Sequence, residues 1–189
     1  EVLIPDEKRG SQRAAGISEI PEIYTRWCAR FVLSAAIRDA VWVEKFKGKR
    51  LVPNLYCFLI GPSGVGKGEA IDVAHRLLKP PDLGLTVFRG KLTCQHLIDR
   101  LGRLKTPGAS KLSLITPELA MSVGRGPLAT DLIRLTTELY TGGDYEFEEG
   151  TRTHGSVKFS GHSVCWLAGT TREWLRDCVS RDAVEGGFF

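Results

Sequence analysis

The sequence lacks several features that would assign it to a specialised class of protein. No stretch holds the roughly 18 or more uncharged apolar residues that a membrane-spanning helix requires. The N-terminal residues 1–5 lack the basic and then apolar order of a signal peptide. No internal repeat and no low-complexity tract is present. These absences predict a cytoplasmic protein without a membrane partner.

The five cysteines form no pattern that would indicate a disulfide framework or a zinc site. None belongs to a C-x-x-C pair, and none lies at a zinc-binding spacing from a histidine. Cys57 and Cys165 occur in strongly apolar runs of strand length. We therefore interpret the cysteines as buried, reduced thiols of an intracellular protein.

The overall charge indicates little about a partner. The formal net charge is +4 over 189 residues, which permits contact with nucleic acid without requiring it. No zinc-finger or helix-turn-helix signature is present, so base-specific recognition is not indicated. Basic residues are concentrated in one short stretch, where a solvated turn would have the same composition: Lys45, Lys47, Lys49 and Arg50.

Apolar patterning divides the chain into three parts. Residues 1–20 are polar and weakly patterned, and predict an N-terminal arm or linker. Residues 21–53 predict a lead-in made of a helix that begins at Pro21, followed by a short strand and a turn. Residues 54–189 predict the main domain.

Within the main domain, apolar runs of strand length alternate with helical patterns. Strands are predicted at 54–60, 85–88, 111–116 and 163–168, and helices at 69–78, 94–104, 129–140 and 173–179. The segments 145–148 and 156–159 alternate around a glycine-containing turn and predict a β-hairpin before the last strand. This alternation predicts an α/β fold with a mostly parallel sheet.

A glycine-rich segment after the first buried strand fits the pattern G-x-x-x-x-G-K of phosphate-binding loops. Glycines allow the tight turn that brings backbone N–H groups against phosphate oxygens, and the following helix adds the positive end of its dipole. Lys67 supplies a mobile positive charge for the β- and γ-phosphates. The loop therefore predicts binding of ATP or a similar nucleotide by Gly61, Pro62, Ser63, Gly64, Val65, Gly66, Lys67, Gly68 and Glu69.

The residue after the lysine departs from the usual pattern. Ser or Thr at that position holds Mg²⁺ through its hydroxyl, but this chain has Gly68. Magnesium must then depend on waters, on the nucleotide or on carboxylates elsewhere, so hydrolysis is less strongly indicated than binding. A Lys-Gly pair also occurs in nucleoside monophosphate kinases, which usually continue with Thr, whereas this chain continues with Glu69.

An acidic residue follows the strand predicted at 111–116. Glu118 stands where P-loop ATPases place a carboxylate that orients the attacking water. The Asp that usually precedes it is missing, and the hydroxyl of Thr116 is a candidate for holding metal-bound water, so Glu118 and Thr116 are the candidate metal ligands. The alternative is that Glu118 only favours the start of a helix near Leu119.

Two hydroxyl residues, Thr170 and Thr171, follow the last predicted strand. In ring ATPases a polar residue at the end of this strand contacts the γ-phosphate or the attacking water. The alternative is ordinary capping of the helix that begins near Arg172.

In combination, these motifs resemble the AAA+-like P-loop ATPases of phage and plasmid replication helicases, within an uncharacterised family often associated with primases. The resemblance runs from about Tyr24 to the end of the chain. The motifs that carry it are Asn54-Leu55-Tyr56 before the phosphate loop, Thr116-Pro117-Glu118-Leu119-Ala120, Leu167-Ala168-Gly169-Thr170-Thr171 and Gly186-Gly187-Phe188. It implies a three-layer sandwich in which the hairpin is an insertion before the strand that senses the γ-phosphate.

The resemblance also implies partners. It implies a homo-oligomeric ring that acts on DNA, most simply single-stranded DNA, with a primase as a possible partner. For a phage-encoded chain it implies the cytoplasm of the bacterial host. The hairpin would point into the pore of the ring, where Arg152, His154 and Lys158 are candidate DNA contacts, although a solvated hairpin tip would be equally polar. The family's arginine finger and lid would follow Phe189, so the chain is expected to be truncated before them.

Three functions are therefore compatible with the sequence. The leading hypothesis is an ATP-hydrolysing motor that uses Mg²⁺, with Lys67 and Glu118 as catalytic residues and Thr170 or Thr171 as the sensor. The second is a nucleotide-bound switch or assembly module with little hydrolysis, favoured by Gly68. The third is a phosphotransferase like the nucleoside monophosphate kinases, favoured by the Lys67-Gly68 pair.

Overall fold

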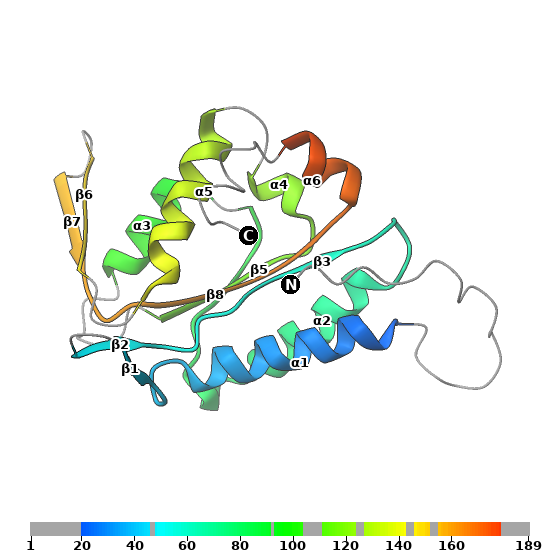
Figure 1. Ribbon diagram of the computed structural model, residues 1–189, viewed down its shortest axis with the longest axis horizontal. Helices are drawn as coiled ribbons and strands as arrows, with labels where there is room; N and C mark the ends of the chain where they lie inside the picture. The colour runs from blue at the N-terminus through cyan, green and yellow to red at the C-terminus, as the bar shows by residue number, and fades with distance from the viewer. Residues whose placement is uncertain are drawn as a thin grey trace.

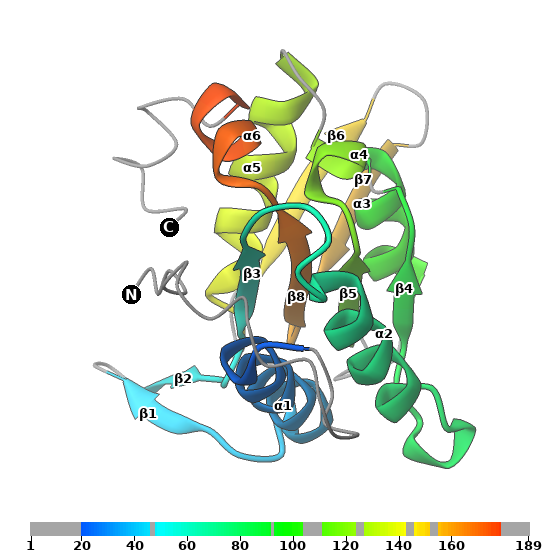
Figure 2. The same cartoon turned by 90° about the vertical axis from the view of Figure 1, so that its right-hand side faces the viewer.

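The computed structural model describes residues 20–45, 48–91, 93–103, 111–123, 127–142, 146–151 and 155–178 (Figure 1). Its centre is a four-stranded sheet in the order β3-β8-β5-β4, in which every neighbouring pair is parallel. The strands are β3 (Tyr56–Ile60), β8 (Ser163–Thr170), β5 (Lys111–Thr116) and β4 (Val87–Arg89). Figure 2 shows this order, with β8 between β3 and β5. The predicted α/β fold with a parallel sheet is confirmed.

The central strand β8 is buried along its whole length. This burial explains why its sequence is a continuous apolar run, because a strand covered by helices on both faces has no solvent-facing side. Trp166 is its largest buried side chain, and it makes edge-to-face contacts with Tyr56 and Phe58 of β3 at ring-centroid distances of 5.9 and 5.4 Å. The sheet is therefore held by packing across β3 and β8 as well as by backbone hydrogen bonds.

Helices cover both faces of the sheet, and each face has its own apolar core (Figure 1). On one face lie α1 (Glu22–Ile37) and α2 (Lys67–Leu78). On the other lie α3 (Cys94–Arg103), α4 (Leu119–Val123), α5 (Pro127–Tyr140) and α6 (Arg172–Cys178). A short 3-10 helix, η2 (Pro81–Leu83), follows α2. Within the described residues, no helix combines the length and apolar character needed to cross a membrane.

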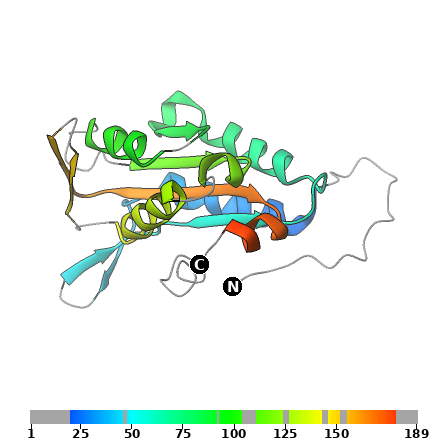
Figure 3. The same cartoon turned by 90° about the horizontal axis from the view of Figure 1, so that it is seen from above.

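Two small antiparallel pairs lie outside the main sheet, at the end where its parallel strands begin (Figure 3). One pairs β1 (Val43–Lys45) with β2 (Lys49–Leu51), and the other pairs β6 (Phe147–Thr151) with β7 (Gly155–Phe159). The predicted hairpin before β8 is thus confirmed. It packs on α3 because Gly102 has no side chain there; a Cβ on Gly102 would stand 2.5 Å from Val157 Cγ1.

The predicted elements agree with the observed ones except near their ends. The strand predicted at 85–88 lies at Val87–Arg89, and the last strand extends beyond 168 to Thr170. In the lead-in, the short strand that was expected after the helix lies at Val43–Lys45. These differences arise because hydrogen bonding to a neighbouring strand, which the local sequence does not reveal, decides where a strand begins and ends.

Next to β8, His162 is buried in the core and only 1% exposed. Its ring lies edge-on to Phe159, with centroids 5.5 Å apart. Burial lowers the pKa of His162 to about 4, although a backbone interaction with Leu139 opposes that shift. The folded protein therefore keeps this imidazole neutral at pH values where an unfolded chain would protonate it.

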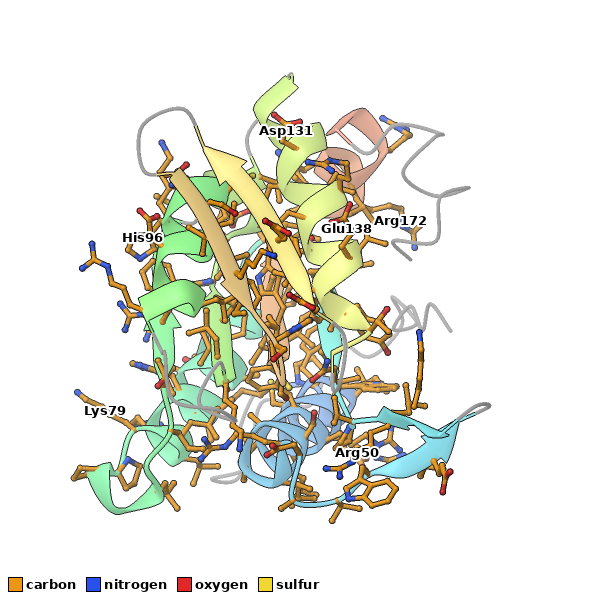
Figure 4. All side chains as sticks on the ribbon, turned by 90° about the vertical axis from the view of Figure 1, so that its left-hand side faces the viewer. Arg50, Lys79, His96, Asp131, Glu138 and Arg172 are labelled. Carbon is orange, nitrogen blue, oxygen red and sulfur yellow. The ribbon has the colours of Figure 1, made fainter. Side chains whose placement is uncertain are left out.

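We predict that His162 makes stability fall as the pH falls from about 6.5 to about 4, because over that window only the unfolded chain binds the proton. The decrease in the free energy of unfolding should reach about 3 kcal/mol at the acidic limit of this window. Urea unfolding at pH 7.0, 5.5 and 4.5 measures it. His162→Leu should show a smaller fall than the wild type, whereas His96→Gln, at an exposed position (Figure 4), should match the wild type. An equal decrease in stability with pH in all three proteins would contradict the prediction.

Candidate functional site

The glycine-rich loop connects the carboxyl end of β3 to the N-terminus of α2, where Figure 2 shows it arching beside the end of β8. Gly64 and Gly66 have positive φ angles of 81° and 79°, a conformation that side chains rarely adopt. Since α2 begins at Lys67, its first N–H groups have no acceptor within the helix and point toward the loop. The loop therefore has the backbone shape and the helix end that an anion site requires.

The first turn of α1 packs against the loop. The Tyr24 hydroxyl donates a hydrogen bond to the Ile60 carbonyl at 2.9 Å. A Cβ on Gly61 would lie 2.1 Å from that hydroxyl oxygen, and a Cβ on Gly66 would lie 3.3 Å from the Cα of Ile20. Gly61 is thus required by its close contact with Tyr24, and Gly66 has little room beside Ile20; the sequence pattern revealed neither contact.

Lys67 lies at the centre of the site. Its ammonium group donates to the carbonyl oxygens of Gly61 at 2.7 Å and Pro62 at 2.5 Å. Partial burial lowers the pKa of Lys67, while the nearby carboxylates of Glu118 and Glu173 raise it. The carboxylates of Glu118, before α4, and Glu173, in the first turn of α6, therefore lie near enough to influence the charge of Lys67.

Glu118 is exposed at the start of α4, and its carbonyl accepts a hydrogen bond from Met121 N at 3.1 Å. The turn that carries it lies against β8 because residue 169 is glycine. A Cβ on Gly169 would stand 2.5 Å from the Pro117 carbonyl oxygen and 3.2 Å from Ile71 Cδ1. Gly169 thus allows the turn that carries the predicted catalytic acid to approach the phosphate loop.

Thr116, Thr170 and Thr171, the three predicted hydroxyl residues, each have a hydrogen-bond partner within the fold. Thr116 is buried, and its hydroxyl accepts a hydrogen bond from the indole N–H of Trp166. Thr170 is also buried, and its hydroxyl lies 3.4 Å from the Thr171 carbonyl oxygen. The Thr171 hydroxyl accepts from Trp174 N at 3.3 Å and so caps α6. Each hydroxyl has a structural partner, which favours the capping interpretation for Thr171 in particular.

Glu173 is an acidic residue of the site that the sequence interpretation missed. It lies exposed in the first turn of α6, two residues after Thr171. The Gly61 N–H donates to the Thr170 carbonyl at 3.2 Å, which holds the end of β8 against the phosphate loop. One feature of the sequence could have revealed Glu173: it is an acid in the first turn of α6, the helix that follows β8 at the same end of the sheet as Lys67.

Gly68 and Glu69, the two predicted loop residues that follow Lys67, lie in the first turn of α2 and are exposed. A Cβ on Gly68 would meet no atom within 4 Å, so neither backbone strain nor crowding requires glycine there. Among the described residues, no group of three or more His, Cys, Asp or Glu side chains is placed to hold a metal ion.

The structure does not bring the hairpin near the phosphate loop. The two lie at opposite ends of the sheet (Figure 1). Lys158 is ion-paired with Glu148 at 2.8 Å and lies 4.0 Å from Glu146, so its charge is already offset. Arg152 and His154, the other predicted DNA contacts, lie outside the described residues, as does the Gly186-Gly187-Phe188 motif.

Comparison of the chain with protein-family models, with curated proteins and with solved structures gave no match.

We predict opposite effects for alanine at two glycines of this site. Gly169→Ala should destabilise the protein by about 1 to 3 kcal/mol, because the added methyl group meets the Pro117 carbonyl. Gly68→Ala should be neutral or stabilise by up to about 1 kcal/mol, because its methyl group enters open space in a helix. Urea unfolding midpoints of the two variants and the wild type measure both. A stable Gly169→Ala variant would show that the turn does not need this close approach.

Proposed function

We propose that this chain is the ATP-binding core of a P-loop ATPase with an AAA+-like three-layer fold. The observation that carries the proposal is the position of Lys67, at a helix N-terminus after a loop with two left-handed glycines, where its ammonium group bonds the loop carbonyls. The carboxylates of Glu118 and Glu173 lie near enough to raise its pKa. Phosphate binding needs the amides and the lysine, and hydrolysis needs a carboxylate at the same place. All of these groups come from the carboxyl ends of neighbouring parallel strands, where α/β sheets bind ligands.

In the proposed mechanism, the loop amides and the N-terminus of α2 bind the phosphate oxygens of ATP. The Lys67 ammonium exchanges its bonds to the Gly61 and Pro62 carbonyls for bonds to the β- and γ-phosphates. Glu118, exposed and on a turn held close to β8, accepts a hydrogen bond from the attacking water and orients it. The water oxygen bonds to the γ-phosphorus as the bond to ADP breaks, Glu118 takes the proton from the water and passes it to solvent, and the products are ADP and phosphate.

In this proposal, carboxylates rather than hydroxyl groups would hold a magnesium ion. Mg²⁺ takes oxygen ligands and in ATPase sites is held by one or two carboxylates together with phosphates and waters. Glu118 and Glu173 would supply these carboxylates, since Gly68 has no hydroxyl and the Thr116 hydroxyl is engaged by Trp166. When bound, the ion would neutralise charge on the phosphates.

The motor role belongs to the same proposal. The hairpin immediately before β8 and the motifs quoted above support a helicase-like ATPase of phage or plasmid replication, working as a homo-oligomeric ring on DNA and alongside a primase. The end of β8 lies between the strands that carry Lys67 and Glu118, so α6 would move with any change in the nucleotide. This connection is what a motor needs to convert hydrolysis into movement.

A second candidate function is a nucleotide-bound switch that hydrolyses little ATP. Two observations favour it: the residue after Lys67 has no hydroxyl, and Thr116 and Thr171 already use their hydroxyl groups within the fold. The kinase alternative has no comparable support in the structure. ADP formation that depends on an added nucleoside monophosphate, and not on DNA, would establish it.

We predict that Lys67→Ala weakens ATP binding by about 100-fold or more, because it removes charge-assisted bonds to the phosphates. Titration with a fluorescent ATP analogue measures this. Lys79→Ala is the matched control, because Lys79 is exposed at the other end of α2 (Figure 4) and should bind like the wild type. Wild-type affinity in the Lys67→Ala variant would refute the nucleotide site.

Replacing the acid should separate binding from hydrolysis. We predict that Glu118→Gln binds ATP normally but loses about 100-fold or more of ATP turnover, because an amide cannot accept the proton of the attacking water. Phosphate release is measured with and without single-stranded DNA. Glu138→Gln, at an exposed site on α5 (Figure 4), is the control. Full turnover by Glu118→Gln would remove Glu118 from the mechanism, and tight ATP binding without turnover in the wild type would favour the switch.

A further inference from the structure

The β1–β2 ribbon extends from the main body at the end of the sheet opposite the phosphate loop (Figure 3). Its strands pair Val43 with Leu51 and Glu44 with Arg50. Both apolar residues of the first pair are exposed, Val43 by 66% and Leu51 by 43%, and the neighbouring Trp42 is exposed by 45%. A two-stranded ribbon gains little stability by itself, so this exposed apolar and aromatic surface is better explained by a binding role than by folding.

Charge is concentrated on the same segment. Residues 41–51 contain four basic residues and one acidic residue, for a net charge of +3, while the whole chain has +4. The β6–β7 hairpin differs, because residues 147–159 contain two basic and two acidic residues, for a net charge of 0. The ribbon is therefore the more cationic of the two projecting pairs of strands, and its charge complements a polyanion.

Arg50 packs against the indole ring of Trp42. The guanidinium carbon of Arg50 lies 4.9 Å from the centroid of the indole ring, a cation–π distance. Figure 4 shows Arg50 on the ribbon, at the edge of the molecule. An exposed indole that is held by an arginine beside further basic residues is the combination that binds single-stranded nucleic acid, because bases stack on the ring and phosphates pair with the cations.

We propose that the β1–β2 ribbon is a binding surface for single-stranded nucleic acid. Trp42 stacks with a base, while Lys49 and Arg50 contact the phosphates on either side. Exposed Val43 and Leu51 alone would suit a protein partner, but the excess of positive charge favours a nucleic acid. This surface rests on the DNA-binding part of the proposed function and deepens it, since it locates the strand on the ribbon and away from the nucleotide site.

The test is fluorescence anisotropy of a fluorescein-labelled oligothymidine of about 20 nucleotides. This length exceeds the roughly 4–16 nucleotides that single-strand-binding OB-fold domains occupy, so it can span one binding surface. Without added ATP, Trp42→Ala should weaken binding about 5- to 100-fold, which is the loss of one stacked base. Trp42→Phe should restore most of it. Thermal midpoints equal to the wild type would show that the exposed substitutions leave the fold intact.

Salt dependence tests the basic residues. The double variant Lys49→Gln/Arg50→Gln should lower the slope of log affinity against log salt by about 1.4, because each phosphate contact on a single strand contributes about 0.7. Arg76→Gln/Lys79→Gln is the matched control, since it removes two exposed basic charges from α2 and should leave the slope unchanged.

Three outcomes would overturn the inference. The first is oligothymidine binding that Trp42→Ala leaves unchanged. The second is the absence of oligothymidine binding in a chain that binds ATP, which would leave the nucleotide site standing. The third is self-association that Trp42→Ala abolishes without any DNA binding, which would assign the ribbon to contact with a second copy of the chain. Conversely, oligothymidine binding that depends on Trp42 but survives Lys67→Ala would support the ribbon independently of the nucleotide site.

Discussion

The backbone contact between the phosphate loop and the end of β8 is the constraint on which the rest of the site depends. Ile60 pairs with Thr170 in the parallel register, and the Gly61 N–H bonds the Thr170 carbonyl at 3.2 Å. This contact places the N-terminus of α6, with Glu173, beside Lys67. It is possible only because the chain has no side chains at Gly61 and Gly169, where Tyr24 and the Pro117 carbonyl approach closely.

At the opposite end of β3, Asn54 fixes how the strand enters the sheet. Its side-chain amide donates to the Tyr140 carbonyl at 2.8 Å, and its side-chain oxygen accepts from the Ser163 hydroxyl at 2.8 Å. One residue thus ties β3 to the end of α5 and to the start of β8. Because Asn54 follows β2 by only a few residues, strand β3 connects the proposed nucleic-acid surface to the proposed nucleotide site, which is a physical basis for coupling between them.

The parts of the site predicted from the sequence are those that short segments specify. The glycine-rich loop between β3 and α2 and the hairpin before β8 were predicted because each depends on residue types within a few positions, while the catalytic role of Glu118 stays a prediction. The roles assigned to Thr116, Thr170 and Thr171 were harder to judge, because a hydroxyl at a strand end is equally suited to a ligand, a helix cap or a buried hydrogen bond. The choice between them depended on which partner the fold placed beside each hydroxyl, such as the Trp166 indole beside Thr116.

By itself, the sequence determined the alternation of strands and helices and the position of the phosphate loop, because apolar periodicity and glycine content act locally along the chain. Only the tertiary structure decided that β8 lies between β3 and β5, that Glu173 joins Glu118 beside Lys67, and that Trp42 and Arg50 stack on an exposed ribbon. The strand order and the carboxylate pair join residues tens of positions apart. Their proximity results from how the strands pair and the helices pack, which no local pattern encodes.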